Sequence, residues 1–172
     1  MEDKQVIQFC KDGNLESFSL LYDKYFDKIY RFIYYKTSSK EIAEDLTSDT
    51  FLKALEAIKG FKGDNFQAWL YKIARNNVID SYRKKKSTVN VDDLWFLGEK
   101  NNIEKDYEKK EVYELISQLD GKQREIVLLR VWENLSYKEI AQIISKTEAA
   151  CKVSFMRALN KLKQQVLLLI LW

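Results

Sequence analysis

Residues 62–86 read KGDNFQAWLYKIARNNVIDSYRKKK, and the rest of the chain is organised around them. At about 100° per residue, one side of a helix over this stretch forms an ordinary core-facing stripe (Phe66, Trp69, Leu70, Ile73 and Ala74). A second strip follows spacings of four, four and three (Tyr71, Arg75, Ile79 and Tyr82), with cations and an amide beside it (Lys72, Asn76 and Arg83). We interpret this second strip as facing solvent.

The second strip has the side chains that suit single-stranded nucleic acid. Aromatic rings stack on unpaired bases and contribute roughly 1–3 kcal/mol each, while Lys and Arg neutralise backbone phosphates. The stretch has seven cations and two acids, a local charge of +5 in a chain whose net charge is +3. A solvated helix face with half-buried tyrosines is the alternative interpretation. The candidate contacts to unpaired strand are Lys62, Asn65, Tyr71, Lys72, Arg75, Asn76, Tyr82, Arg83 and Lys84.

The composition predicts a soluble all-α protein. The 172 residues are 46% apolar and include five glycines and no proline, so few residues interrupt helices. The two cysteines have no partner pattern, and the polar N-terminus has no secretory signal, which together indicate the reducing cytoplasm.

The residues of known catalytic sites are missing from the sequence. Histidine, the commonest general base and metal ligand, is absent, and there is no Gly-rich phosphate loop, nucleophile elbow or cysteine cluster. We therefore expect no catalysis, no metal and no cofactor.

The helix before the basic stretch carries an acidic stripe. It opens with Ser38-Ser39-Lys40-Glu41, a capping-box pattern in which Ser38 accepts from the Glu41 amide, and runs to about Lys59. An exposed leucine among carboxylates is typical of a docking face for a basic protein partner, although a solvated face is the alternative. The stripe is Glu41, Asp45, Asp49, Leu52 and Glu56, and the candidate docking residues are Asp45, Leu46, Asp49, Phe51, Leu52 and Glu56.

Two neighbouring segments add to the first half. Residues 14–35 are predicted to form an amphipathic helix whose aromatic rings pack in the core. There are more rings than one face can bury, so some of them could instead meet a partner. Residues 60–65, GFKGDN, contain two glycines and form a loop that could hold a flipped base.

The chain divides into two small helical domains joined by an acidic linker. Between Ser87 and Glu114 there are eight acids and four lysines, without a sustained apolar period. We predict a first domain at 1–86, a linker at 87–110 and a second domain at 111–172. The apolar end, residues 166–172, is far shorter than the roughly 20 residues that span a bilayer. A buried helix end, a partner contact and a truncated terminus all fit it.

The second domain carries a helix-turn-helix pattern. A capping box at Ser136-Tyr137-Lys138-Glu139 opens one helix, Ser145-Lys146 forms a tight turn, and Thr147 caps a basic last helix whose Cys151 faces inwards. A plain helical hairpin with a solvated basic side is the alternative. The candidate duplex contacts are Tyr137, Lys146, Thr147, Glu148, Lys152, Ser154, Arg157 and Lys161.

Both halves together resemble a bacterial RNA polymerase sigma factor of the extracytoplasmic-function class. The resemblance covers nearly the whole chain, through DLTSDTFLKALEAIKGFKGDNFQAWLYKIARNNVIDSYRKKK in the first domain and LSYKEIAQIISKTEAACKVSFMRALNKL in the second. It departs at Ser154, where such sequences often have arginine, at Met156, where histidine is common, and in the apolar end.

The resemblance implies a role for each segment. The helix at 45–59 would dock on the β′ clamp helices of core RNA polymerase, and the second domain would meet the β flap. Residues 60–86 would melt promoter DNA and recognise one strand, and the last helix would recognise the more distant promoter element as duplex. An anti-sigma factor, often membrane-anchored in this family, would be a further partner.

We therefore predict a sigma factor that directs promoter recognition and transcription initiation. The alternative is a free-standing helix-turn-helix regulator whose first half is a dimerisation or sensing bundle.

Overall fold

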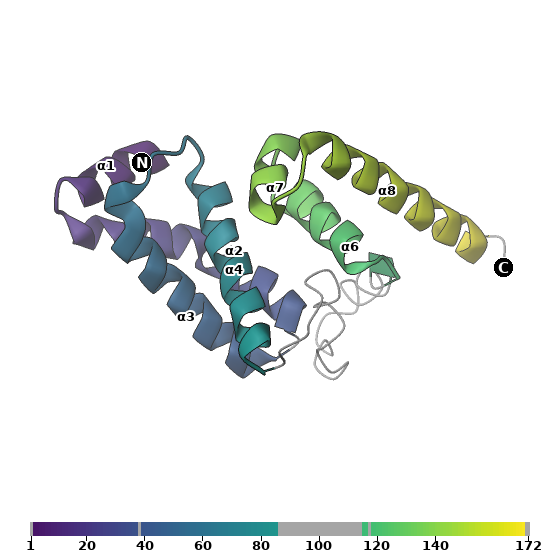
Figure 1. Ribbon diagram of the computed structural model, residues 1–172, viewed down its shortest axis with the longest axis horizontal. Helices are drawn as coiled ribbons and strands as arrows, with labels where there is room; N and C mark the ends of the chain where they lie inside the picture. The colour runs from purple at the N-terminus through teal and green to yellow at the C-terminus, as the bar shows by residue number, and fades with distance from the viewer. Residues whose placement is uncertain (1, 38, 86–114, 117, 171–172) are drawn as a thin grey trace. The chain divides into compact units, whose positions relative to one another are not determined.

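The computed structural model describes residues 2–37, 39–85, 115–116 and 118–170, with only the backbone of residues 85 and 167–170. The chain divides into two compact units, Met1–Thr88 and Val89–Trp172, coloured purple to teal and green to yellow in Figure 1. Every regular element in the described ranges is helical, which confirms the predicted all-α class. The predicted linker, Ser38 and the last two residues of the apolar end lie outside these ranges.

The described residues of the first unit form four α-helices and two short 3₁₀ turns. They are α1 (Asp3–Lys11), η1 (Leu15–Ser17), α2 (Phe18–Thr37), α3 (Lys40–Ala57), η2 (Ile58–Gly60) and α4 (Phe66–Lys85). Helices α2, α3 and α4 pack on one another, while α1 packs against α2 and η2. Ile29 and Ile33 of α2 and Leu70 of α4 are completely buried at the centre of this unit.

The helix starts of the first unit differ from the sequence prediction, and the helix predicted over residues 14–35 begins as the 3₁₀ turn η1 before α2 starts at Phe18. Helix α1 was not predicted, and it begins with a capping box between Glu2 and Gln5. The cap of α3 is Ser39, whose hydroxyl accepts from the Ile42 amide at 3.4 Å, one position later than predicted. Adjacent serines offer the same hydroxyl, so the sequence does not determine which one takes the cap position.

The face of α4 that we predicted to be exposed is buried. Tyr71 has no exposed surface, and its ring lies at 89° to Phe32 of α2 with centroids 5.0 Å apart. Arg75 and Ile79 are also buried. The half-buried Tyr82 donates its hydroxyl to the carbonyl of Lys36 at 3.2 Å. The prediction of a solvent-facing strip here is wrong, because a helix that packs on two neighbours buries more than one stripe, and tyrosine and arginine have apolar bodies that pack well.

A buried polar contact joins α3 to α4. The Asn77 amide donates to the Thr50 hydroxyl at 3.0 Å, and its carbonyl oxygen accepts from the Lys53 ammonium at 2.5 Å. Both Asn77 and Thr50 are buried, and the Thr50 hydroxyl, which donates to the carbonyl of Leu46 at 2.6 Å, is the acceptor for the Asn77 amide. The contact therefore fixes the alignment of α4 along α3.

The second unit is built on α6 (Gly121–Val127), a π-helical turn (η4, Leu128–Trp132), α7 (Tyr137–Ile144) and α8 (Glu148–Ile170). Its core combines residues before α6 with residues of α6 and α8 (Ile116, Leu119, Val127 and Ala158). The buried Arg124 donates to the carbonyls of Ile116 and Leu119, so the guanidinium satisfies backbone oxygens that face the interior.

The predicted helix-turn-helix is confirmed at its caps. Ser136 and Glu139 form the predicted capping box of α7, and the Thr147 hydroxyl accepts from the Ala150 amide at 3.2 Å. Ser145 ends α7 in the left-handed conformation, with φ of 55°. Cys151 is buried as predicted, and burial raises the pKa of its thiol, so the cysteine is a packing residue and a poor nucleophile.

We predict that Asn77→Ala destabilises the first unit by roughly 1–3 kcal/mol, because the hydrogen bonds that join α4 to Thr50 and Lys53 of α3 are lost. Hydrogen exchange of the α4 amides measures opening of this unit by itself. The control is Asn76→Ala, which changes an exposed neighbour and should shift stability by at most about 0.5 kcal/mol. Equal effects of the two substitutions would contradict the assigned orientation of α4.

Candidate nucleic-acid interface

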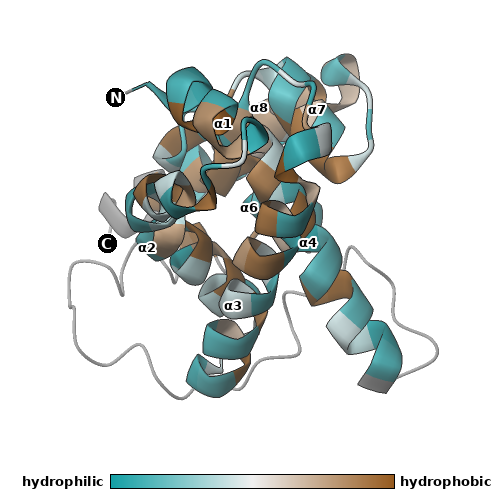
Figure 2. Ribbon diagram, turned by 90° about the vertical axis from the view of Figure 1, so that its left-hand side faces the viewer, coloured by the Kyte–Doolittle hydropathy of each residue, from teal (hydrophilic) through white to brown (hydrophobic). Residues whose placement is uncertain are grey.

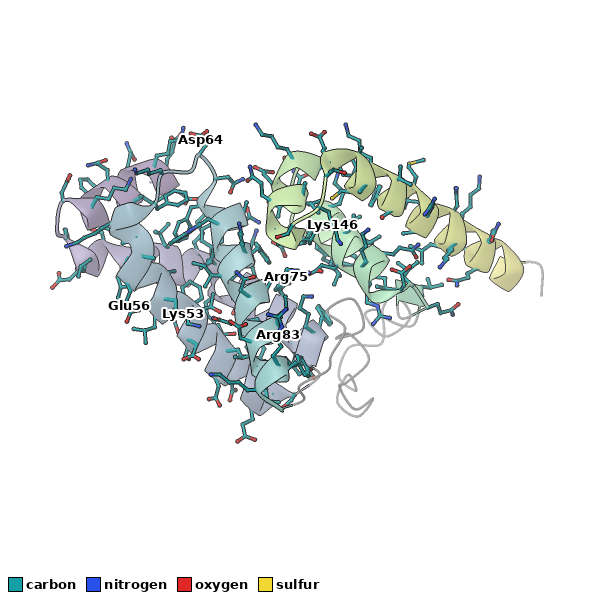
Figure 3. The ribbon with its side chains drawn as sticks, viewed as in Figure 1. Lys53, Glu56, Asp64, Arg75, Arg83 and Lys146 are labelled. Carbon is teal, nitrogen blue, oxygen red and sulfur yellow. The ribbon has the colours of Figure 1, made fainter. Side chains whose placement is uncertain are left out.

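The solvent side of α4 presents a polar face, but its residues are not those of the predicted strip. Its exposed members are Lys72, Asn76, Asp80 and Arg83, and the half-buried Trp69 and Ile73 lie between them at helical spacing. We call these six residues the exposed α4 face. Hydrophilic residues predominate towards its end (Figure 2), where Arg83 lies in Figure 3. Lys84 is also exposed and extends the positive charge.

Trp69 is the aromatic residue that sequence reasoning missed. We placed it in the core, but its side chain is only partly buried. Its ring contacts Phe61 and Phe66, with centroids 4.9 and 5.5 Å away, so neighbouring rings hold the indole while part of it remains accessible. The sequence feature that places Trp69 on the exposed side is its helical spacing of three, four and seven residues from Lys72, Ile73 and Asn76.

The structure therefore divides the predicted single-strand set. Lys62, Lys72, Asn76, Arg83 and Lys84 are exposed, and Asn65 is partly exposed. Tyr71 and Arg75 are buried, and Tyr82 is half-buried with a raised pKa caused by burial. These last three position the helix, and they do not form an open stacking platform.

A pocket of about 550 Å³ opens where the loop before α4 faces α1. The loop supplies Phe61 and the segment from Lys62 to Asn65, which includes the labelled Asp64 (Figure 3); α1 supplies Lys4, Ile7 and Lys11. The pocket thus combines apolar, amide and cationic groups with the carboxylates of Glu2, Asp3 and Asp64. A base removed from its stack needs stacking, edge hydrogen bonds and neutralised phosphate, and the ring, amide and lysine groups of the lining suit these needs.

Several contacts hold the pocket in shape. The Asn65 side chain caps α4 by accepting from the Ala68 amide at 3.0 Å. Tyr25 in the pocket wall donates its hydroxyl to the Asp3 carboxylate, and Lys24 pairs with the same carboxylate at 2.6 Å. Burial, followed by the contact with Asp3, raises the pKa of Tyr25 well above its usual range. Tyr25 is therefore a neutral hydrogen-bond donor at neutral pH.

Gly63 leaves room for the neighbouring ring in this loop. A Cβ at this position would lie 2.9 Å from the edge of Phe61. A larger residue would therefore push the ring and change the pocket wall.

The acidic stripe on α3 is exposed largely as predicted. Leu52 is 55% exposed, and Asp45, Asp49 and Glu56 are exposed with it; Figure 3 labels Glu56. Leu46 and Phe51, which we included in the docking set, are buried. Including them as surface contacts was wrong: the Phe51 ring packs against three rings of α2 (Phe18, Tyr22 and Phe26), where it buries more apolar area than on the surface.

The surplus aromatic residues of α2 form a ladder along one side. Tyr22, Phe26, Tyr30 and Tyr34 follow one another at four-residue spacing, with centroids 5.1, 6.3 and 6.1 Å apart. Each ring keeps some exposed surface. The contacts between these rings account for much of the aromatic surplus of α2, and no partner protein is needed for this. A partner that contacts the rings stays a prediction.

The helix-turn-helix exposes most of its predicted contacts. Lys146, Thr147, Glu148, Lys152, Arg157 and Lys161 are exposed. Ser154 is half-buried. Tyr137 is also half-buried, with Arg130 and Lys152 over its ring at 5.0 and 5.8 Å and Phe155 at its edge. Tyr137 therefore ties the π-helical turn, α7 and α8 together.

The described residues hold no group of histidine, cysteine or acidic side chains that could bind a metal ion. No helix in the described ranges is long and apolar enough to cross a membrane.

Comparison with known proteins gives matches for both units. The family model for Sigma-70 region 2 matches residues 21–88, and the model for Sigma-70, region 4 matches residues 109–162. The chain is 33% identical over 148 residues to the ECF RNA polymerase sigma factor SigM of Bacillus subtilis, covering 83% of this chain and 91% of SigM. It is 36% identical over 168 residues to the ECF RNA polymerase sigma factor BldN of Streptomyces coelicolor, covering 92% of this chain but only 63% of BldN.

Solved structures show the same fold at lower identity. CnrH, solved in complex with the cytosolic domain of CnrY, matches with a TM-score of 0.73 and 22% identity over 95% of this chain and 96% of CnrH. The sigma factor RpoE from Bartonella quintana, solved with the anti-sigma factor NepR, matches with a TM-score of 0.67 and 23% identity over 88% of this chain and 97% of RpoE.

Proposed function

The chain belongs to the ECF class of RNA polymerase sigma factors, and we propose that it binds core RNA polymerase and directs it to promoters. The observation that carries the proposal is that each unit exposes a basic helix face of a different kind. The exposed α4 face offers a ring beside cations, whereas α8 offers a helix-turn-helix surface. The alternative of a free-standing regulator is not favoured, because the first unit matches sigma region 2 along most of its length.

We propose that the first unit recognises the melted promoter strand. In place of Tyr71, the accessible part of the Trp69 ring supplies the stacking surface, with Lys72 and Arg83 placed for phosphates and Asn76 for a base edge. The pocket between α1 and the loop before α4 takes a flipped base. Because bases must be unpaired to reach either feature, this unit acts on opened DNA.

We propose that α8 lies in the major groove of the distant promoter element. The exposed cations Lys146, Arg157 and Lys161 neutralise phosphates, and the first turns of the helix face the base edges. Glu148 and Lys152 pair at 2.8 Å in the free protein, so each exchanges that partner for DNA on binding.

The partner on the acidic α3 stripe is core polymerase. By family resemblance the contact is with the β′ clamp helices, while the β flap meets the second unit. We also propose an anti-sigma factor, as in the RpoE complex, which would compete with polymerase. The cytoplasm, where polymerase transcribes, is the proposed site of action.

The test is open-complex formation. Purified protein and core polymerase are added together and singly to promoter DNA carrying 2-aminopurine at the start-proximal element. Fluorescence should rise only when both proteins are present. Binding of the chain alone to a palindromic duplex, with no opening in the presence of polymerase, would support the regulator instead.

We predict that Leu52→Arg abolishes capture of core polymerase. The substitution removes the apolar anchor of the stripe and places a cation beside carboxylates that select a basic surface. Pull-down of purified polymerase is the measurement. Leu15→Arg is the control, since Leu15 is 45% exposed outside the stripe and should retain capture. Equal capture by both variants would remove the docking claim.

We predict that Trp69→Ala reduces opening of closed promoter DNA by about fivefold or more, which corresponds to one lost stacking contact. On a premelted bubble the variant should recover partly and stay below wild type, because the bubble supplies strand separation but no stacking surface. Stopped-flow fluorescence on both templates measures this. Trp69→Tyr retains a ring and should recover most of the activity.

Tyr71→Phe tests whether Tyr71 of α4 is a packing residue. This substitution keeps a ring in the buried site and should leave both templates unaffected. Wild-type behaviour of Trp69→Ala on both templates would show that the indole only packs against Phe61 and Phe66.

A further inference from the structure

The side of α8 that points directly away from the core is apolar over its first turns. Cys151 and Ala158 mark the inner side, with no exposed surface. At 100° per residue, the opposite side carries Ala149, Val153 and Met156. Val153 is 49% exposed and Met156 is 55% exposed. The residues that would reach deepest into a groove are therefore not the polar ones.

The charges around this apolar stripe indicate what covers it. Lys152 and Arg157 flank it, and Lys146 and Lys161 are exposed at the turn before α8 and farther along the helix. Glu148 is the only acidic residue of α8, and it already pairs with Lys152. A stripe framed by cations fits a polyanion, and the major groove of DNA exposes one apolar group among its base edges, the C5-methyl of thymine.

We propose that Val153 and Met156 recognise thymine methyl groups in the distant promoter element. The inference rests on the proposed function, in which α8 lies in the major groove. Both side chains are unable to hydrogen-bond a base edge through N–H or O–H groups, so the discrimination they provide comes from burying methyl groups. The flanking cations hold the helix in the groove and carry no sequence information of their own.

The test compares thymine with deoxyuridine, which lacks only the C5-methyl and keeps every hydrogen-bonding group. Holoenzyme assembled from the full chain and core polymerase first selects duplexes from a random-sequence pool. Each thymine of the enriched upstream element is then replaced singly by deoxyuridine, and the Kd is measured. At one or more positions, wild type should bind deoxyuridine about fourfold more weakly, as expected for one buried methyl.

Substitution of the two residues should remove this preference. In Val153→Ala or Met156→Ala holoenzyme, the ratio of the two Kd values should fall to one at a defined position. Val166→Ala, an exposed apolar residue farther along the same helix, should keep the wild-type ratio. Circular dichroism verifies that all three variants are folded, as expected for surface positions.

The outcomes separate this inference from the proposed function. If no upstream element is enriched, the proposed duplex role fails, and this inference fails with it. If an element is enriched and Arg157→Ala weakens its binding, but deoxyuridine is bound as tightly as thymine at every position, only the methyl inference is overturned. A Kd ratio that stays unchanged in Val153→Ala and Met156→Ala would also overturn it, and a wild-type dimer that these substitutions dissociate would assign the stripe to a second copy of the chain.

Discussion

Burial of the wide inner face of α4 is the constraint on which the first unit depends. Tyr71, Arg75 and Ile79 are buried on α4, which packs against α2 and α3, and full burial of an apolar side chain such as that of Ile stabilises a fold by about 1.5–3 kcal/mol. Rotating α4 by one residue, about 100°, would expose Tyr71 and bury Lys72. The packing of α4 therefore determines which of its residues can reach DNA.

The polar contact between Asn77 and Thr50 reinforces the same choice. A purely apolar face tolerates small rotations and shifts, but a buried amide has few acceptable positions once its partners are fixed. The core packing of this unit therefore determines the geometry of its candidate DNA-binding face. The same helix that fills the core presents Trp69, Lys72 and Asn76 to solvent.

The sequence was most informative where structure depends on neighbouring residues. The caps of α7 and α8 at Ser136 and Thr147 were predicted correctly, because a capping hydroxyl acts within three residues of the backbone it satisfies. The face of α4 was assigned wrongly, because periodicity shows that two stripes exist but not that both are buried. Trp69 and Tyr71 are only two positions apart, and either ring suits a core.

Long-range contacts explain the other errors. Phe51 and Leu46 looked available for docking, and only the rings of α2 show that Phe51 is enclosed. The outward position of Val153 and Met156 was missed for a related reason. Exposed apolar residues have no local signature, and the polar residues around them already suggested a DNA surface. Only the folded chain shows that Val153 and Met156 are exposed.

The central claim is that the outward side of α4 meets unpaired promoter DNA only in the presence of polymerase. Site-specific photocrosslinking from a benzophenone amino acid at Asn76 tests it directly. In complexes of the chain, core polymerase and promoter, the crosslink should map to one strand within the melted region and disappear when polymerase is omitted. A crosslink to intact duplex in the absence of polymerase, or only to protein in the complete complex, would contradict the account.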